Sequence, residues 1–247
     1  MRPVYLQAYA ALLPAEAGGA VPGFDPVDAG IPRKSLKTMT RAVQLGVACV
    51  RQALEGYPAW ASIPPERRGL FVGASPQQGE ASDLAPALQA TGPVPDLLAF
   101  AERGVPLVPP LWLVKGLSNN VLGYASANHD LRGDNGNWCD GRLGGAVAVA
   151  AAIHAVAEAR CDIAIGGGAD ALRGAEPMLG RPCGEGAVFF VFSAVPGPWL
   201  ATAGVPGEQG AASHLGELGA VAVPASLALG LPGDVAAGGV RFRPVGH

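Results

Sequence analysis

The residues best suited to chemistry lie between Asn119 and Asp170, where a cysteine and an arginine stand just before a long run of small apolar residues. Cys139 could act as a nucleophile, because a helix N-terminus or a nearby cation lowers the pKa of a thiol. Asp140 works against this role, since a carboxylate beside the sulfur raises the pKa of the thiol. Arg142 stays protonated, so its guanidinium can bind an anion but cannot attack an electrophile. The simpler alternatives are an ordinary half-buried cysteine and an arginine in a surface loop.

The elements that must position these residues follow from the pattern of apolar side chains. Leu143 to Arg160 is almost continuously Ala, Val and Ile after two glycines, which predicts a helix that is apolar on nearly all sides and therefore buried. Asp162 to Ile165, bounded by glycines, predicts a short buried strand. Pro3 to Leu12 predicts another strand of the same sheet. Pro32 to Tyr57 predicts an amphipathic surface helix with a basic N-terminal half.

Composition limits the class of function. The chain has 247 residues, 49% of them hydrophobic, and a mean hydropathy of +0.28, which supports a sizeable core. Charged residues make up 15% of the chain and the net charge is −3, so the sequence does not predict a positive surface that would bind nucleic acid. The sequence shows no secretory signal, no apolar run long enough to span a bilayer and no CxxC pair, which predicts a cytoplasmic protein with reduced thiols. Metal-ligand, P-loop, dinucleotide and Gly-x-Ser-x-Gly patterns are also absent from the sequence, so no cofactor and no metal site are predicted.

Four blocks of residues occur in an order and spacing typical of one family. They are Asn119 with Gly123, Leu131-Arg132-Gly133, Gly145 near the start of the predicted helix, and Gly167-Gly168-Ala169-Asp170. The chain in this respect resembles the β-ketoacyl synthases of the thiolase-like fold. In that family a strand leads from the Leu-Arg-Gly block to a cysteine nucleophile, and Cys-x-Ser-Gly opens a buried helix. The resemblance implies an α/β fold, the N-terminal half of the thiolase-like (ketosynthase) architecture, layered α/β/α with a mixed, mostly parallel sheet.

Alignment of these blocks without a gap places Arg142 at the nucleophile position of the family. Counting forward from Gly133 and backward from Gly167 gives the same register, whereas Cys139 reaches that position only through a three-residue gap. Condensation of this kind needs a thiolate to carry the acyl chain as a thioester. The resemblance therefore implies a pseudoenzyme with no catalytic residue of its own, and Cys139 is the rival candidate.

The resemblance also implies where the chain would contact an acyl chain and a second subunit. By analogy, the segment from Leu111 to Tyr124 lies near the floor of the acyl tunnel and the dimer seam. Core packing is the simpler alternative for Trp112. The predicted binding residues are Leu111, Trp112, Asn119, Gly123, Tyr124 and Arg142.

The resemblance covers about residues 1–205, which are predicted to form a ketosynthase-like N-terminal domain. Residues 206–247 are predicted to be a Gly- and Pro-rich C-terminal extension, partly irregular. The second half of the family fold, which supplies catalytic histidines, is not recognisable, and His214 resembles its histidine block only faintly. The apolar sheet and helix faces which that half would cover are therefore expected to be exposed and to need a partner.

Together these features predict a non-catalytic, chain-length-factor-like subunit that forms a heterodimer with an active β-ketoacyl synthase. Such a subunit, as in aryl-polyene type II polyketide systems, shapes the tunnel in which a polyketide, polyene or fatty-acid-like chain grows. The basic half of the helix at Pro32 to Tyr57 would dock an acyl carrier protein or the partner, unless it is a solvated face. Two other classes stay open: an atypical condensing or acyl-transfer enzyme that uses Cys139, and a stand-alone protein that binds an acyl group or a phosphopantetheine phosphate through Arg142.

Overall fold

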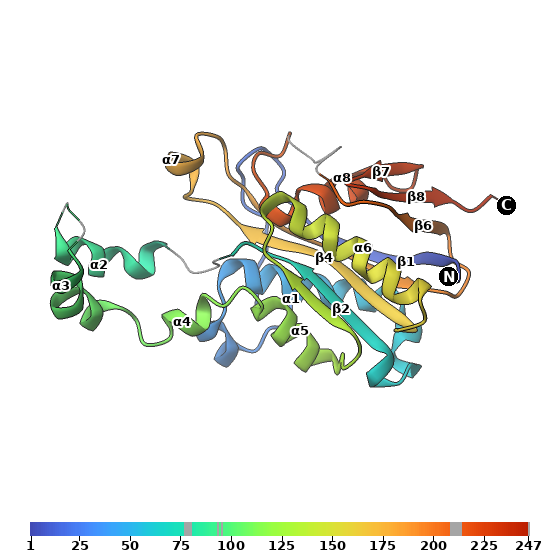
Figure 1. Ribbon diagram of the computed structural model, residues 1–247, viewed down its shortest axis with the longest axis horizontal. Coiled ribbons are helices and arrows are strands. Elements are labelled where there is room, and N and C mark those ends of the chain that lie inside the picture. Colours follow the sequence, from blue (N-terminus) through green and yellow to red (C-terminus); the bar gives the residue numbers. More distant parts are fainter. Residues whose placement is uncertain (77–80, 93, 95, 208–213, 247) are drawn as a thin grey trace.

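One eight-stranded sheet forms the centre of the molecule (Figure 1). The computed structural model describes residues 1–76, 81–92, 94, 96–207 and 214–246. The strand order is β3-β2-β4-β5-β1-β6-β8-β7. The strands are β1 (Val4–Leu12), β2 (Arg68–Gly73), β3 (Asn135–Trp138), β4 (Ile163–Ala171), β5 (Glu185–Ser193), β6 (Trp199–Ala203), β7 (Val235–Ala237) and β8 (Val240–Pro244).

The sheet is mixed. β2 pairs in parallel with β3 and with β4, and the other pairings, from β4 with β5 to β7 with β8, are antiparallel. These pairings make β1, β2, β3, β4 and β8 run in one direction and β5, β6 and β7 in the other. The predicted α/β fold with a mixed sheet is confirmed, although most neighbouring strands are antiparallel.

Helices cover both faces of the sheet, so the fold has three layers. α1 (Arg41–Glu55) and α5 (Asn120–His129) pack on one face, and α6 (Gly144–Ala157) and α8 (Ala222–Gly230) on the other. Among the described residues, none of the helices combines the length and the hydropathy that a membrane span needs. The remaining helices and turns are η1 (Arg33–Thr38), η2 (Pro58–Ser62), η3 (Pro65–Arg67), α2 (Ala81–Thr91), α3 (Leu97–Ala99), η4 (Phe100–Gly104), η5 (Val105–Leu107), α4 (Trp112–Lys115), η6 (Gly141–Leu143), α7 (Glu176–Leu179) and η7 (Gly219–Val221).

The predicted turn, helix and strand around the nucleophile position are present. α6 is buried along most of its length, as its small apolar residues predict. β4 is longer than the predicted strand, because the glycines expected to bound it lie within it. A Cβ at Gly166 would lie only 2.7 Å from the Cβ of Ala152 on α6, so this glycine allows the helix to pack closely on the sheet.

The helix predicted over residues 32–57 is divided in two. η1 ends at an extended residue, Met39, whose side chain is buried, and α1 begins after Thr40. The extended, buried Met39 therefore interrupts the helix that the sequence predicts to be continuous. α1 is also mostly buried, and its Arg41 pairs with the buried carboxylate of Glu185 at 2.7 Å (Nη2 to Oε1). Arg33, Lys34 and Lys37 of η1 are exposed, and on α1 Arg51 is exposed as well.

The C-terminal residues complete the sheet and cover it. α8, β7 and β8 lie in the stretch predicted to be a partly irregular extension, and β8 pairs with β6. Val221, Leu227 and Phe242 are fully buried against α6, β5 and their neighbours. The prediction that the apolar sheet and helix faces lie exposed is therefore wrong, because the chain covers them itself.

Exposed apolar surface gathers instead on an arm, defined here as residues Ala81 to Leu117 without the undescribed 93 and 95. Figure 1 shows this arm, with α2, α3 and α4, projecting to one side of the sheet. Lys115 Nζ donates a hydrogen bond of 2.7 Å to Asp83 Oδ2, and this ion pair joins α4 to α2 at the base of the arm. The large apolar residues exposed on the arm are Leu88, Val94, Leu97, Leu98, Val105, Leu107, Leu111, Leu113, Val114 and Leu117.

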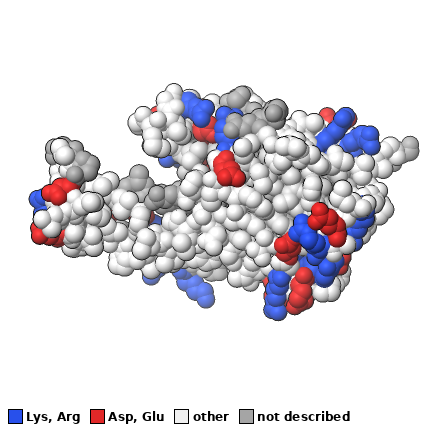
Figure 2. All heavy atoms as spheres, viewed as in Figure 1, with Lys and Arg blue, Asp and Glu red and all other residues white. Residues whose placement is uncertain are grey.

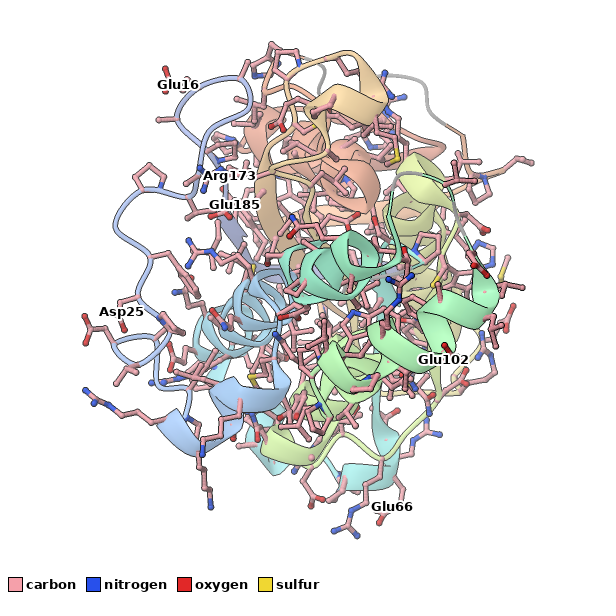
Figure 3. All side chains as sticks on the ribbon, turned by 90° about the vertical axis from the view of Figure 1, so that its left-hand side faces the viewer. Glu16, Asp25, Glu66, Glu102, Arg173 and Glu185 are labelled. Carbon is pink, nitrogen blue, oxygen red and sulfur yellow. The ribbon has the colours of Figure 1, made fainter. Side chains whose placement is uncertain are left out.

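The arm carries few charges. On the face seen in Figure 2 they lie at its outer end, and most of the remaining surface there is uncharged. Figure 3, viewed along the arm, shows Glu102 on its outer surface and Glu185 against the body of the molecule. The arm is thus a largely apolar projection from a body whose core is already closed.

Candidate functional site

Two strand ends, a helix start and a C-terminal turn meet at one point. β2 ends at Gly73, β4 passes through Gly168, and Gly145 lies in the first turn of α6. A Cβ at Gly168 would lie 2.5 Å from the carbonyl oxygen of Ala220 in η7, and a Cβ at Gly145 would overlap with the same oxygen. The backbone of η7 therefore lies directly against the start of α6, where only glycine leaves room for it.

Arg142 lies in η6, immediately before α6, and its side chain is 23% exposed. Its Nη1 atom is 3.5 Å from Oε2 of Glu217, whose side chain is only 4% exposed. The same oxygen is 2.6 Å from Nη2 of Arg181. The other carboxylate oxygen, Oε1, accepts a hydrogen bond of 3.0 Å from the backbone N–H of Gly219. The buried charge of Glu217 is thus compensated by two guanidinium groups and a backbone donor.

Asp170 holds a second buried carboxylate at this point, 1% exposed. Its Oδ1 accepts from the backbone N–H of Ser75 at 3.0 Å and its Oδ2 from that of Ala220 at 2.7 Å. Burial raises the pKa of Asp170 to about 6; the hydrogen bonds from Ser75 and Ala220 counteract this, and the charge of Glu217 adds to it. Asp170 therefore joins the ends of β2 and β4 to η7.

The raised pKa of Asp170 predicts a pH dependence of stability. Because the ordinary pKa is 3.8 and the folded value about 6, the carboxyl favours the folded state fully below pH 3.8 and loses that contribution as the pH rises through 6. The full loss should be about 3 kcal/mol, at about 1.4 kcal/mol for each unit between the two pKa values, and about 2 kcal/mol of it should fall between pH 4.5 and 7. Urea unfolding of the natural chain and of Asp170→Asn at pH 4.5 and 7 measures it.

The comparison between the two proteins isolates the contribution of Asp170 to the pH dependence of stability. His129, whose pKa is lowered by burial and by the charge of Arg51, is present in both chains and therefore does not affect the difference between them. The natural chain should lose stability relative to Asp170→Asn as the pH rises. Stability curves of the two proteins that run parallel from pH 4.5 to 7 would contradict the predicted titration.

Cys139 directly follows β3, and η6 separates it from α6. It is half-buried, and its Sγ accepts a 3.4 Å hydrogen bond from Nδ2 of Asn137. The structure therefore does not place this thiol at the start of the helix, where a dipole would favour the thiolate. Among the other thiols, burial raises the pKa of Cys49 to about 12 and also raises the pKa of Cys161 and Cys183.

The other predicted binding residues lie around the base of the arm. Leu111, 42% exposed, and half-buried Trp112 stand at the start of α4. Asn119 and Gly123 are exposed in the first turn of α5, where the Gly123 N–H donates to the Asn119 carbonyl at 2.9 Å. Tyr124 is half-buried, and its hydroxyl hydrogen-bonds the hydroxyl of Thr38.

The structure therefore brings five of the six predicted residues together along α4 and the start of α5. Nδ2 of Asn120 ties these two helices by donating to the carbonyls of Val114 at 2.7 Å and Lys115 at 3.2 Å. Arg142 stands apart from them, because it precedes α6 on the other face of the sheet. Across the residues described, no group of three or more His, Cys, Asp or Glu side chains could hold a metal ion.

Sequence reasoning missed Glu217, which pairs with Arg142, and Arg181, which pairs with the same carboxylate. Glu217 lies between two glycines with left-handed backbone, Gly216 and Gly219, which mark a sharply turned segment. That local signal could have identified a turn. It could not have identified the carboxylate as a partner of Arg142, because the two residues are 75 positions apart in the sequence.

Solved structures of known proteins share this fold. An acyl carrier protein of a type II polyketide synthase in complex with its ketosynthase bound to the hexaketide matches with a TM-score of 0.65 and 14% identity, over 78% of this chain and 62% of that chain. The ishigamide ketosynthase/chain length factor matches with a TM-score of 0.62 and 18% identity, over 78% and 58%. A β-ketoacyl synthase from Burkholderia phymatum matches with a TM-score of 0.56 and 16% identity, over 86% and 67%.

This chain thus spans about three fifths of the length of the first two structures. No match was found among curated protein sequences. The sequence model of the β-ketoacyl synthase N-terminal domain matches residues 6–181, well over half of the chain. Together with the thiolase-like arrangement of strands and helices, this match confirms the family that the sequence motifs indicate: the chain belongs to the β-ketoacyl synthase family and carries its N-terminal domain.

Proposed function

We propose that this chain is a non-catalytic, chain-length-factor-like subunit that forms a heterodimer with an active β-ketoacyl synthase. The observation that carries the proposal is the ion pair of Arg142 with Glu217 at the start of α6. The family resemblance assigns the nucleophile to this position, and a guanidinium held by a buried carboxylate has no lone pair with which to attack a thioester. The partner would supply the nucleophile, and this chain would shape the tunnel in which a polyketide, polyene or fatty-acid-like chain grows.

The arm supports the need for a partner. Exposed apolar side chains that gather on one projection favour burial against another surface. Leu113 is 72% exposed and Leu117 51% exposed, and both stand close in sequence to the predicted binding residues Leu111 and Asn119. We propose that Leu111, Trp112, Asn119, Gly123 and Tyr124 form the seam with the partner and border the acyl tunnel.

Electrostatic attraction would bring an acyl carrier protein to the complex. Arg33, Lys34 and Lys37 are exposed on η1, and η1 packs beside α4 at the base of the arm. A group of cations steers an acidic partner and raises its association rate. One of the structural relatives is a ketosynthase in complex with its acyl carrier protein, and another is a ketosynthase/chain length factor, which supports such partners for this chain.

The proposal is tested by the mass of the chain in solution, alone and after co-expression with a β-ketoacyl synthase encoded nearby. Light scattering should find a one-to-one complex. That complex should condense acyl groups, keep its activity after Cys139→Ala and lose it when the cysteine nucleophile of the partner is replaced. Arg142 itself is left unchanged, because it holds Glu217 in place.

The second candidate function, condensation or acyl transfer by Cys139, is a distinct outcome of the same experiment. A chain that condenses acyl groups alone and loses the activity on Cys139→Ala would overturn the proposal. A stable monomer that binds phosphopantetheine and forms no complex would favour the stand-alone binding protein instead.

A further inference from the structure

Gly123 lies in the middle of the outer face of α5. Asn119, Gly123 and Ala127 stand at every fourth position, so they share one face of the helix, and all three are exposed. Val121 and Ala125, on the opposite face, are fully buried. α5 therefore packs on the body of the molecule with one face, and no described part of the chain covers the face that carries Gly123.

Packing within this chain does not explain the glycine at position 123. It lies in a helical conformation that any residue adopts, and a Cβ there would meet nothing within 4 Å. The glycines inside α1, α6 and α8, in contrast, all lie where another group comes close; at Gly46, for example, a Cβ would lie 2.7 Å from Cγ1 of Val121. Glycine inside a helix is destabilising relative to alanine. Gly123 therefore marks a close approach by a group outside the described chain.

Apolar side chains continue this face onto α4, at the base of the arm (Figure 1). Leu113 is 72% exposed and Leu117 51% exposed. Asn120 joins the two helices by donating hydrogen bonds to carbonyl groups of α4. From the start of α4 to the end of α5 the only Lys, Arg, Asp or Glu is Lys115, which pairs with Asp83. This face therefore fits an apolar protein surface, whereas the cations of η1 suit an acidic carrier protein.

We propose that a helix of the β-ketoacyl synthase subunit crosses α5 at Gly123, and that this glycine lets the two backbones approach closely. The inference deepens the proposed function and rests on it for the identity of the partner. The side chains at the contact set the distance between two packed helices, so glycine at the crossing point gives the shortest one. Gly123 thereby selects the partner by shape, because a subunit with a bulky side chain at the crossing could not dock.

Substitutions at position 123 should act in opposite directions on the isolated chain and on the complex. Gly123→Ala should stabilise the isolated chain against urea, because alanine is the better helix former and has room there. It should nevertheless weaken the complex with the synthase about tenfold, because its methyl group holds the two helices apart. Gly123→Gln should weaken the complex at least about 100-fold. Calorimetry measures the affinities, and unfolding of each isolated variant shows whether its fold is intact.

The matched control is Ala61→Gln, which enlarges an exposed residue of η2, outside the arm, α4 and α5. It should leave the affinity within about threefold of the natural value. A complex that forms and is unaffected by Gly123→Gln would overturn the inference and leave the proposed function standing. An isolated chain that is a homodimer and dissociates on Gly123→Gln would assign the crossing helix to a second copy, which also contradicts the inference. If the natural chain forms no complex with the synthase, the inference fails together with the proposed function.

Discussion

Gly145→Ala should lower the free energy of unfolding of this chain by about 3 kcal/mol, although alanine is the better helix former. The added Cβ would overlap with the Ala220 carbonyl oxygen and lie 2.8 Å from Cγ of Pro224 on α8. Neither group is the free end of a flexible side chain, so α6 must move away from η7 and α8. Separation would weaken the contacts of Ala220 with Asp170 as well. Urea unfolding followed by circular dichroism measures the change.

Gly123→Ala is the matched control, because Gly123 also lies in a helix but a Cβ there would meet nothing within 4 Å. This substitution should stabilise the isolated chain by up to about 1 kcal/mol, through the higher helix propensity of alanine. If both substitutions had the same small effect, α6 and η7 would not be in close contact. The pair of variants therefore measures how tightly the start of α6 packs against η7 and α8.

The elements around the site could be predicted because their sequence signals are local. The small apolar residues of α6 indicate burial on all sides, and the glycines of β4 indicate close approach of a helix. The family register depends on the spacing from Gly133 to Gly167, which is also contained in one stretch of sequence. The structure supports that stretch as a single unit, in which β3, α6 and β4 follow one another.

The packing of η7 and α8 against the start of α6 could not be predicted in this way, because it depends on contacts between distant residues. Glu217 contacts Arg142 and Arg181 only because α8 folds back onto α6. Composition indicates a Gly- and Pro-rich C-terminal stretch but does not indicate which face it covers. For the same reason, the expected exposure of the sheet face was wrong and the exposure of the arm was missed. Exposure is a property of the assembled layers and not of a local pattern.

The position of the exposed apolar surface changes which contact a partner would make. A partner that covered a bare sheet would have to replace α6 or α8 packing, yet both helices are already buried by the chain itself. The arm, in contrast, presents apolar side chains that its own body does not cover. Exposed apolar side chains that gather in one patch favour burial against a partner surface. The arm and the seam at α4 and α5 are therefore where substitutions should act on the proposed complex.

Leu113→Arg should weaken the complex with a β-ketoacyl synthase at least about 100-fold, because it places an unpaired charge where apolar side chains would be buried. The side chain of Leu113 is 72% exposed on α4, so the substitution should leave the stability of the isolated chain nearly unchanged. Affinity measured by calorimetry, with unfolding of the isolated variant as a check, separates the two effects.

Val195→Arg provides the comparison, since Val195 is an apolar residue that is 56% exposed in the turn between β5 and β6, outside the arm. It should leave the affinity for the synthase within about threefold of the natural value, as most surface substitutions outside an interface do. Equal weakening by both substitutions would point to a general effect of charge and not to docking through the arm. Full affinity of Leu113→Arg would place the interface elsewhere on the molecule and overturn the proposed seam, because Leu113 directly follows Leu111 and Trp112, which are assigned to it.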